Sequence, residues 1–189
     1  MLKLFARSLP MLMRANRQPL VPATEAVATR FQVLPHDIDI NRHLNNGRYL
    51  QLIDVNRAEW LIRTGMLEVI RRNRWKPILG SLAMNYRREL CLWERATVET
   101  RLVGWDQRWT YLEHRVTNEK SGRPVAFGIA KAGFRSQDRW VAPEILRLQL
   151  PFPLSSMVLP GHAQALLAFD READTCHQRK QGEMVGSYT

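Results

Sequence analysis

The strongest constraint on the fold is one long apolar helix that is followed by strands. Residues 47–64 are predicted to be helical, and their apolar side chains cover more than a narrow stripe, which indicates burial on most sides. Strands are predicted at the following residues: 29–34, 78–90, 96–105, 109–118 and 125–136. Because the helix has only this sheet to pack against, we expect an α+β fold with an antiparallel sheet wrapped around the helix.

The segments outside this pattern are assigned from glycine and proline residues that typically end or begin helices. Gly65 is a natural stop for the long helix, and residues 71–77 are expected to form a loop. Pro143 is expected to open a short helix, and residues 162–179 a final one. The sequence thus predicts a basic arm at residues 1–28, one domain at 29–140 and a C-terminal extension at 141–189.

Composition narrows the class of partner. The chain of 189 residues is 45% hydrophobic and 24% charged, as in ordinary globular proteins, and its net charge of +10 favours anionic partners. No apolar run reaches the ~20 residues of a membrane-spanning helix. Basic residues are scattered rather than clustered, so nucleic acid is not the expected partner. Cys91 and Cys176 supply neither a disulfide framework nor a zinc site, and we predict no metal and no cofactor.

The N-terminal arm is basic and free of acidic residues before Glu25. Its bases are Lys3, Arg7, Arg14 and Arg17. This composition is typical of an organelle transit peptide, and it equally suits an amphipathic arm that lies on the domain or on a membrane surface. We expect a cytoplasmic protein, with mitochondrial targeting or peripheral membrane contact through residues 1–20 as the alternatives.

The segment before the long helix carries the chemistry. Asp39, Asn41 and His43 occupy alternate positions, so in an extended segment their side chains would point the same way. The helix start at Asn45 to Gly47 would offer free backbone N–H groups and a positive dipole end. A carboxylate, an amide and an imidazole beside such a site suit acyl transfer. Taken singly, Asp and Asn before a helix are more often caps or turn residues.

The letters H-D-I-D-I-N-R-H-L-N-N-G-R-Y-L resemble the signature of hotdog-fold acyl thioesterases, and especially that of plant acyl-carrier-protein thioesterases. Residues 86–89, Y-R-R-E, are similar to a second motif of that family, and G-W-D at 104–106 resembles the thioesterase-superfamily-member-6 branch. The resemblance covers about residues 30–136. It implies a hotdog fold for the α+β domain.

The resemblance also implies roles for particular residues. Asp39 corresponds to the catalytic carboxylate, Asn41 to its neighbour, His43 to the imidazole and Glu89 to an acidic position, while Asn46 falls where similar enzymes bind the oxyanion. Asn45 and Gly47 flank that position and are expected to bind the substrate through the backbone N–H groups of the helix start. From their charge, either Arg87 and Arg88 or the triplet Arg71, Arg72 and Arg74 are candidates for binding coenzyme A phosphates, although such a triplet is usually a solvated loop. The family's cysteine falls on Leu90, and a shift of one residue to Cys91 would place the thiol on the opposite face of a strand.

The expected function is hydrolysis of an acyl thioester carried by coenzyme A or by acyl-carrier protein. Hydration of enoyl thioesters is less favoured, because that motif resembles D-x-N-P-x-H and Arg42 stands in place of its proline. The alternative is a non-catalytic hotdog protein that binds acyl thioesters or lipids. By the same resemblance we expect a homodimer, or a higher oligomer, with the site at the interface.

Overall fold

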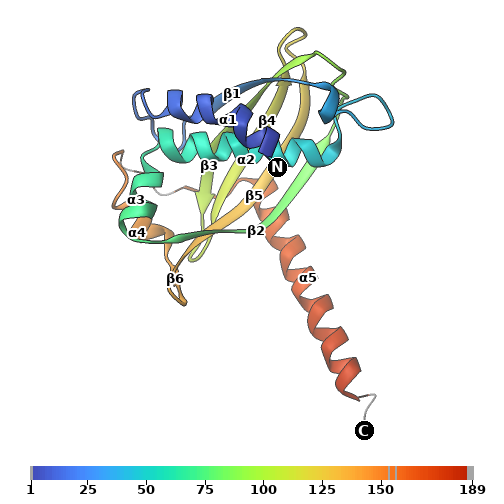
Figure 1. Cartoon of the computed structure of the whole chain (residues 1–189). Helices are drawn as coiled ribbons and strands as arrows, with labels where there is room; N and C mark the ends of the chain where they lie inside the picture. Colours follow the sequence, from blue (N-terminus) through green and yellow to red (C-terminus); the bar gives the residue numbers. More distant parts are fainter. Residues whose placement is uncertain (1, 153, 156, 187–189) are drawn as a thin grey trace.

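An antiparallel sheet curls around one long helix, α2 (Asn46–Arg63), in a computed structural model that describes residues 2–152, 154–155 and 157–186 (Figure 1). Met1 of the predicted arm and residues 153, 156 and 187–189 of the predicted extension lie outside these ranges. The described strands are β1 (Val27–Gln32), β2 (Lys76–Tyr86), β3 (Arg95–Trp105), β4 (Thr110–Asn118), β5 (Pro124–Ser136) and β6 (Arg139–Val141). The other helices are α1 (Leu2–Ala15), the 3-10 helix η1 (Pro35–Asp37), α3 (Met66–Arg72), α4 (Pro143–Arg147) and α5 (Gly161–Gly186). The predicted α+β architecture is confirmed.

The sheet has the strand order β1-β3-β4-β5-β2, with β6 added beside the end of β5. Neighbouring strands all run antiparallel, and the register aligns Val98 with Val116 and Met84 with Gly128. β2 is therefore an edge strand that pairs only with β5 among the described strands. It is eleven residues long and largely exposed, which leaves one row of its backbone hydrogen-bonding groups open.

The core lies between α2 and the concave face of the sheet. One apolar cluster surrounds Trp60, and a second surrounds Ile53. Asn56 lies about one turn from each, and it is fully buried in a polar layer. Its amide donates to Thr29 Oγ1 at 2.8 Å and accepts from Thr100, whose hydroxyl lies 2.8 Å from His114 Nδ1. The core is thus apolar at both ends and hydrogen-bonded in the middle.

The two ends of the chain cover different surfaces. α1 lies along α2, with Ala15 buried at its end (Figure 1). α5 begins on the other face of the sheet, where Ala163 and Leu166 pack with Tyr111. It then projects away from the sheet (Figure 1). Within the described residues, no helix is both long and apolar enough to span a bilayer.

Most predicted elements are confirmed within a few residues, and Gly65 has the left-handed φ of +74° that a helix stop requires. The predicted strand 78–90 is too long, because β2 ends at Tyr86. The predicted loop at 71–77 is wrong at its start, because residues 66–72 form α3. The spacing of Met66, Val69 and Ile70, all buried in the core, explains this helix. β6 was not predicted, and α5 extends beyond residues 162–179.

Candidate active site

The motif loop is a tight turn and not the extended segment that the alternation suggested. Ile38 and Leu44 form an antiparallel bridge, and the Asp39 N–H donates to the carbonyl of His43 at 3.1 Å. The Arg42 N–H closes the turn on the Asp39 carbonyl at 3.1 Å, with Arg42 at φ 64°. Asp39 and His43 consequently face each other across the turn. Asn41 is exposed at its tip, so the expected convergence of three side chains is wrong for this residue.

Asp39 is a partly shielded carboxylate whose two oxygens differ. Its side chain is 18% exposed, and Oδ1 accepts the backbone N–H of Asn41 at 2.8 Å. The same oxygen lies 3.7 Å from His43 Nδ1, which is also 3.4 Å from the carbonyl of Leu44. Oδ2 has no hydrogen-bond partner among the described residues. One oxygen therefore fixes the carboxylate, and the other is available to a water molecule or a substrate.

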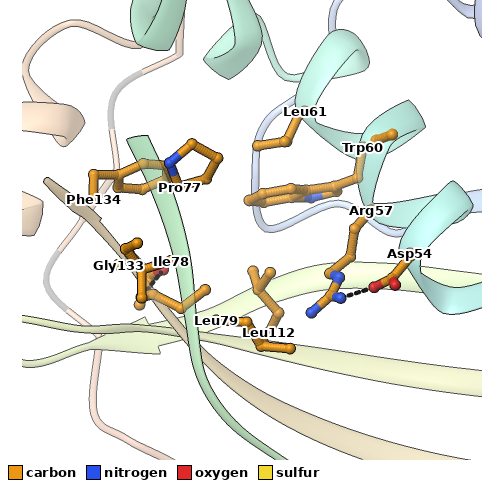
Figure 2. Close-up of a pocket in the computed structure, with 13 residues that line it drawn as sticks. Asp54, Arg57, Trp60, Leu61, Pro77, Ile78, Leu79, Leu112, Gly133 and Phe134 are labelled. Atoms are coloured by element: carbon orange, nitrogen blue, oxygen red, sulfur yellow. Dashed lines mark hydrogen bonds and ion pairs between the residues drawn. The ribbon is translucent and has the colours of Figure 1, made fainter. Parts of the chain in front are cut away.

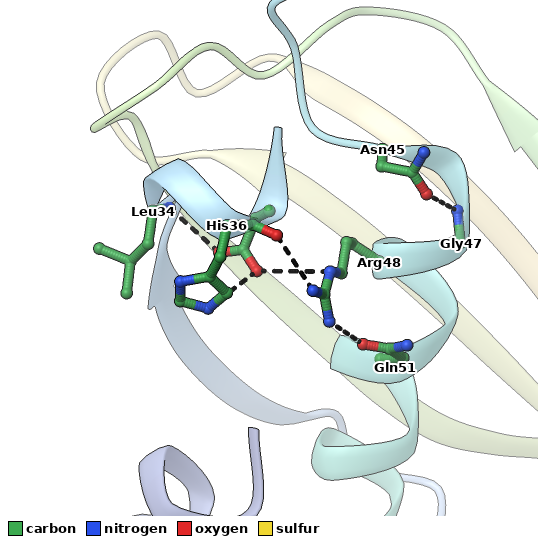
Figure 3. Close-up of polar contacts among 7 residues, drawn as sticks. Leu34, His36, Asn45, Gly47, Arg48 and Gln51 are labelled. Carbon is green, nitrogen blue, oxygen red and sulfur yellow. Dashed lines mark hydrogen bonds and ion pairs between the residues drawn. The ribbon is translucent and has the colours of Figure 1, made fainter. Parts of the chain in front are cut away.

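A second aspartate, which sequence reasoning did not single out, anchors this turn to α2. Asp37 is buried, and its Oδ2 accepts the N–H of Leu34 at 3.0 Å. Its Oδ1 lies 3.7 Å from Arg48 Nε in the first turn of α2 (Figure 3). Arg48 also donates to the carbonyl of His36 at 3.0 Å and to Gln51. Asp37 is the first aspartate of the D-x-D pattern in the motif, and this was the sequence signal that could have identified it.

The start of α2 is capped by the side chain of the residue that precedes the helix. Asn45 is the N-cap residue, and its Oδ1 accepts the N–H of Gly47 at 2.9 Å (Figure 3). The expectation of a free Gly47 amide is therefore wrong. The Asn46 N–H has no hydrogen-bond partner among the described residues, so this amide is the one that can bind an oxyanion.

A hollow of about 260 Å³ lies where the start of α2 meets the chain that leaves β2. It brings together five of the predicted site residues, while Asp39, Asn41, Asn45 and Gly47 do not line it. Its lining residues are His43, Leu44, Asn46, Tyr49, Tyr86, Arg87, Arg88 and Glu89. His43 is thus shared between the carboxylate pair and the hollow.

Two tyrosines, Tyr49 and Tyr86, line this hollow, and neither was predicted as a site residue. The Tyr86 hydroxyl donates to the carbonyl of Asn46 at 3.2 Å, and the rings of Tyr49 and Tyr86 meet edge to face at 5.2 Å. Burial raises the pKa of Tyr49, with further contributions from Tyr86 and Glu94, and burial also raises the pKa of Tyr86. Both hydroxyls are therefore neutral at physiological pH. The signal for Tyr49 was its place in the N-N-x-x-Y part of the motif.

The cysteine beside the site is a poor nucleophile. Cys91 forms an antiparallel bridge with His43, and Leu90 at the family's cysteine position is fully buried. Desolvation raises the pKa of the Cys91 thiol, and the carboxylates of Glu89 and Glu94 raise it further. A protonated thiol neither attacks nor activates water. The geometry therefore supports carboxylate chemistry rather than thiol chemistry.

A larger apolar cavity of about 320 Å³ lies farther along α2, facing β2 (Figure 2). Trp60 and Leu61 of α2 lie opposite Pro77 and Ile78 of β2. The ion pair of Asp54 with Arg57 lies on one wall. The sequence predicted this ion pair on the surface of the helix. It did not reveal the cavity, because the cavity depends on the distance between β2 and α2.

With a helix wrapped by a sheet and the Asp39–His43 pair just before its start, the chain matches a known family. A model of the thioesterase-like superfamily matches residues 33–153. The chain belongs to this superfamily. It is 33% identical over 112 residues to Protein THEM6 of Xenopus laevis, covering 59% of this chain and 54% of that protein. It is 24% identical over 98 residues to the long-chain acyl-CoA thioesterase FadM of Escherichia coli, covering 52% and 74%.

The chain spans about half the length of the THEM6 proteins that it matches; for that of Danio rerio the identity is 36% over 91 residues, 48% of this chain and 45% of the relative. Solved structures show the same fold. The probable thioesterase YbaW of Escherichia coli superposes with a TM-score of 0.61 at 22% identity, covering 64% of this chain and 93% of that one. The Staphylococcus aureus protein SAV2348, solved in complex with CoA, superposes with a TM-score of 0.59 at 15% identity, covering 76% and 94%. The predicted hotdog fold is confirmed.

Proposed function

We propose that this protein hydrolyses an acyl thioester to a free acid and a thiol. The observation that carries the proposal is the Asp39–His43 pair beside the hollow at the start of α2, in a chain of the thioesterase-like superfamily. A thiolate is a good leaving group, so the reaction needs a positioned base or nucleophile and an oxyanion donor more than a strong acid.

In the proposed reaction, Asp39 Oδ2 takes a proton from water as the water oxygen attacks the thioester carbonyl. The Asn46 N–H would stabilise the oxyanion of the tetrahedral intermediate, aided by the dipole of α2. When the carbon–sulfur bond breaks, the sulfur leaves as a thiolate, and the proton that Asp39 took from water passes to it through His43 or through a water molecule. Direct attack by Asp39 would instead form a mixed anhydride, which water then hydrolyses to the same products.

The other predicted residues fit binding roles in this proposal. Arg87 and Arg88 are exposed on the rim of the hollow, where they would pair with phosphates of a coenzyme A carrier. The apolar cavity between α2 and β2 would receive the acyl chain. FadM is named a long-chain acyl-CoA thioesterase, which supports coenzyme A as the carrier to test first.

The test is steady-state hydrolysis of acyl-coenzyme A thioesters of graded chain length by the wild type, Asp39→Asn and Asp39→Ala. We expect both variants to lose about a hundredfold or more in kcat, as when a general base is removed. Asn41→Ala, at the exposed tip of the same turn, is the matched control and should retain activity. Equal rates in the wild type and both Asp39 variants would refute the proposal.

A non-catalytic acyl-binding role is the second candidate, and one observation favours it. Asp39 Oδ1 is engaged by the Asn41 N–H, and the Gly47 N–H is engaged by Asn45, as in an ordinary turn and helix cap. In that case acyl-coenzyme A would bind without turnover, and Asp39→Ala would leave its Kd unchanged. Calorimetric titration with a non-hydrolysable thioether analogue measures this Kd, and binding without any hydrolysis of the matching thioester by the wild type would assign this second role.

A further inference from the structure

The N-terminal helix leaves an apolar side exposed after it has packed on the domain. Ala15 at the end of α1 is 1% exposed, whereas Leu9 is 46% and Met13 is 57% exposed. Leu9 and Met13 are four residues apart, so they lie on the same side of α1. Leu20, which follows the helix, is also exposed. Leu9 and Met13 thus give α1 an exposed apolar side, and Leu20 adds an exposed apolar residue in the segment after it.

Basic residues flank this surface, and the buried carboxylate of Glu59 on α2 interacts electrostatically with one of them, Arg14. Arg14 and Arg17 are exposed, and neither has an ion-pair partner among the described residues. No acidic residue occurs in the first 24 positions of the chain, while the whole chain carries a net charge of +10. The sequence of α1 is strongly amphipathic. A basic amphipathic helix of this kind is suited to the interface of an anionic bilayer.

The segment after α1 is held to the end of α2 by one backbone hydrogen bond and one side-chain hydrogen bond. The Val21 N–H donates to the carbonyl of Arg63 at 2.8 Å, and Arg63 Nε donates to the carbonyl of Pro19 at 3.0 Å. These bonds fix the segment after α1 to the end of α2 and hold α1 alongside it (Figure 1). Removing the exposed side chains of Leu9 and Met13 therefore leaves the anchor intact.

We infer that α1 docks this protein on an anionic membrane surface, with Leu9, Met13 and Leu20 in the acyl boundary. Arg14 and Arg17 then lie at the level of the lipid phosphates. A second copy of the chain is a poorer occupant, because it would bring the same exposed arginines, Arg14 and Arg17, against each other. The inference goes beyond the proposed hydrolysis and does not depend on it.

The test is co-sedimentation of the full chain with vesicles of phosphatidylcholine alone, and of phosphatidylcholine and phosphatidylglycerol in equal parts. We expect binding to the anionic vesicles that weakens as salt is added. The variant Leu9→Ser with Met13→Ser should bind about tenfold more weakly, because it loses apolar area. The variant Arg14→Gln with Arg17→Gln should lose about tenfold and much of the salt dependence.

Phe169→Ser is the matched control, because Phe169 is 65% exposed on α5 and its loss should not change vesicle binding. Equal binding to both kinds of vesicle would overturn the inference, as would full binding by the Leu9/Met13 variant. Light scattering provides a further check on the same variants. If the Leu9/Met13 variant converts a larger species to a smaller one, the surface joins copies of the chain and the membrane proposal is wrong.

Discussion

Asp37 and Asp39 lie two residues apart in the motif, yet their surroundings separate their roles. Asp37 is buried and accepts from Leu34, while Arg48 lies beside its other oxygen, so its carboxylate is used by the fold. Asp39 is partly exposed, and its Oδ2 is free of hydrogen bonds from the described residues. Burial and partners, rather than residue type, thus determine which carboxylate is available for chemistry.

Asp37→Ala should destabilise the protein while Asp39→Ala should not. Loss of Asp37 leaves the Leu34 N–H without its acceptor and Arg48 without its carboxylate, at a cost of about 1–3 kcal/mol. Chemical denaturation of the two variants measures the difference. An Asp39→Ala variant that is the less stable of the two would show that Asp39 is mainly a turn residue.

His114 makes the stability of the protein depend on pH. Burial, with Arg57 as a second cause, lowers its pKa to about 3, whereas an imidazole in the unfolded chain titrates near its ordinary value of 6.5. Between these values the unfolded chain binds a proton that the folded chain does not. The free energy of unfolding should therefore fall as the pH falls below 6.5, by up to about 1.4 kcal/mol per pH unit.

His114→Gln removes this titration and keeps an amide that can pair with Thr100. Urea unfolding of the wild type and of this variant at pH 7 and pH 5 tests the assignment. The wild type should lose more stability than the variant between these pH values. Parallel losses in the two proteins would show that His114 does not account for the pH dependence.

At the scale of elements, the start of α2 combines a structural cap with a chemical site. Asn45 caps the Gly47 N–H, and Tyr86 ties the first helical residue to the end of β2. Asn46, whose N–H is not capped, is one of the residues that line the hollow. The helix start is therefore rigid, which suits an oxyanion donor that must not move during the reaction.

Asn45→Ala should separate these two roles. The loss of the cap should cost about 1 kcal/mol of stability. Hydrolysis by the folded variant should be retained, because the proposed oxyanion donor is the N–H of Asn46. Thermal unfolding and kcat on one thioester are the two measurements. A loss of kcat as large as that of Asp39→Ala would assign the oxyanion role to the side chain of Asn45 instead.

At the scale of the whole molecule, the open edge of β2 is a surface on which another strand could pair. β2 is eleven residues long and pairs only with β5 among the described strands, and Lys76 is its one charged residue. Long, weakly charged edges of this kind pair with other strands unless they are protected. We propose that two copies join antiparallel through β2, which would place the site close to the interface.

Ala83→Glu tests the proposed dimer. Ala83 is exposed in β2, and two copies paired through this strand would bring the introduced carboxylates close together. Light scattering should give twice 22.0 kDa for the wild type and a shift towards 22.0 kDa for the variant. A wild type that scatters as 22.0 kDa at all concentrations would contradict the dimer.

The sequence by itself determined the long helix, the longer strands and the family to which this protein belongs. Apolar spacing identified the long helix, alternation identified the strands, and the motif identified the residues around the start of that helix. These signals are local, because each depends on residues within a few positions of one another. The short α3 was missed because its apolar spacing covers only seven residues and lies next to an arginine-rich stretch.

Only the tertiary structure decided how the candidate residues meet. Asn41 and His43 alternate with Asp39 in sequence, but a turn closed at Arg42 keeps His43 beside Asp39 and sends Asn41 outward. The distance between β2 and α2, which opens the apolar cavity, likewise results from contacts between segments far apart in the chain. Neither a turn with a left-handed residue nor the spacing of two packed elements is encoded in any single short pattern, because both are settled by the sum of long-range packing.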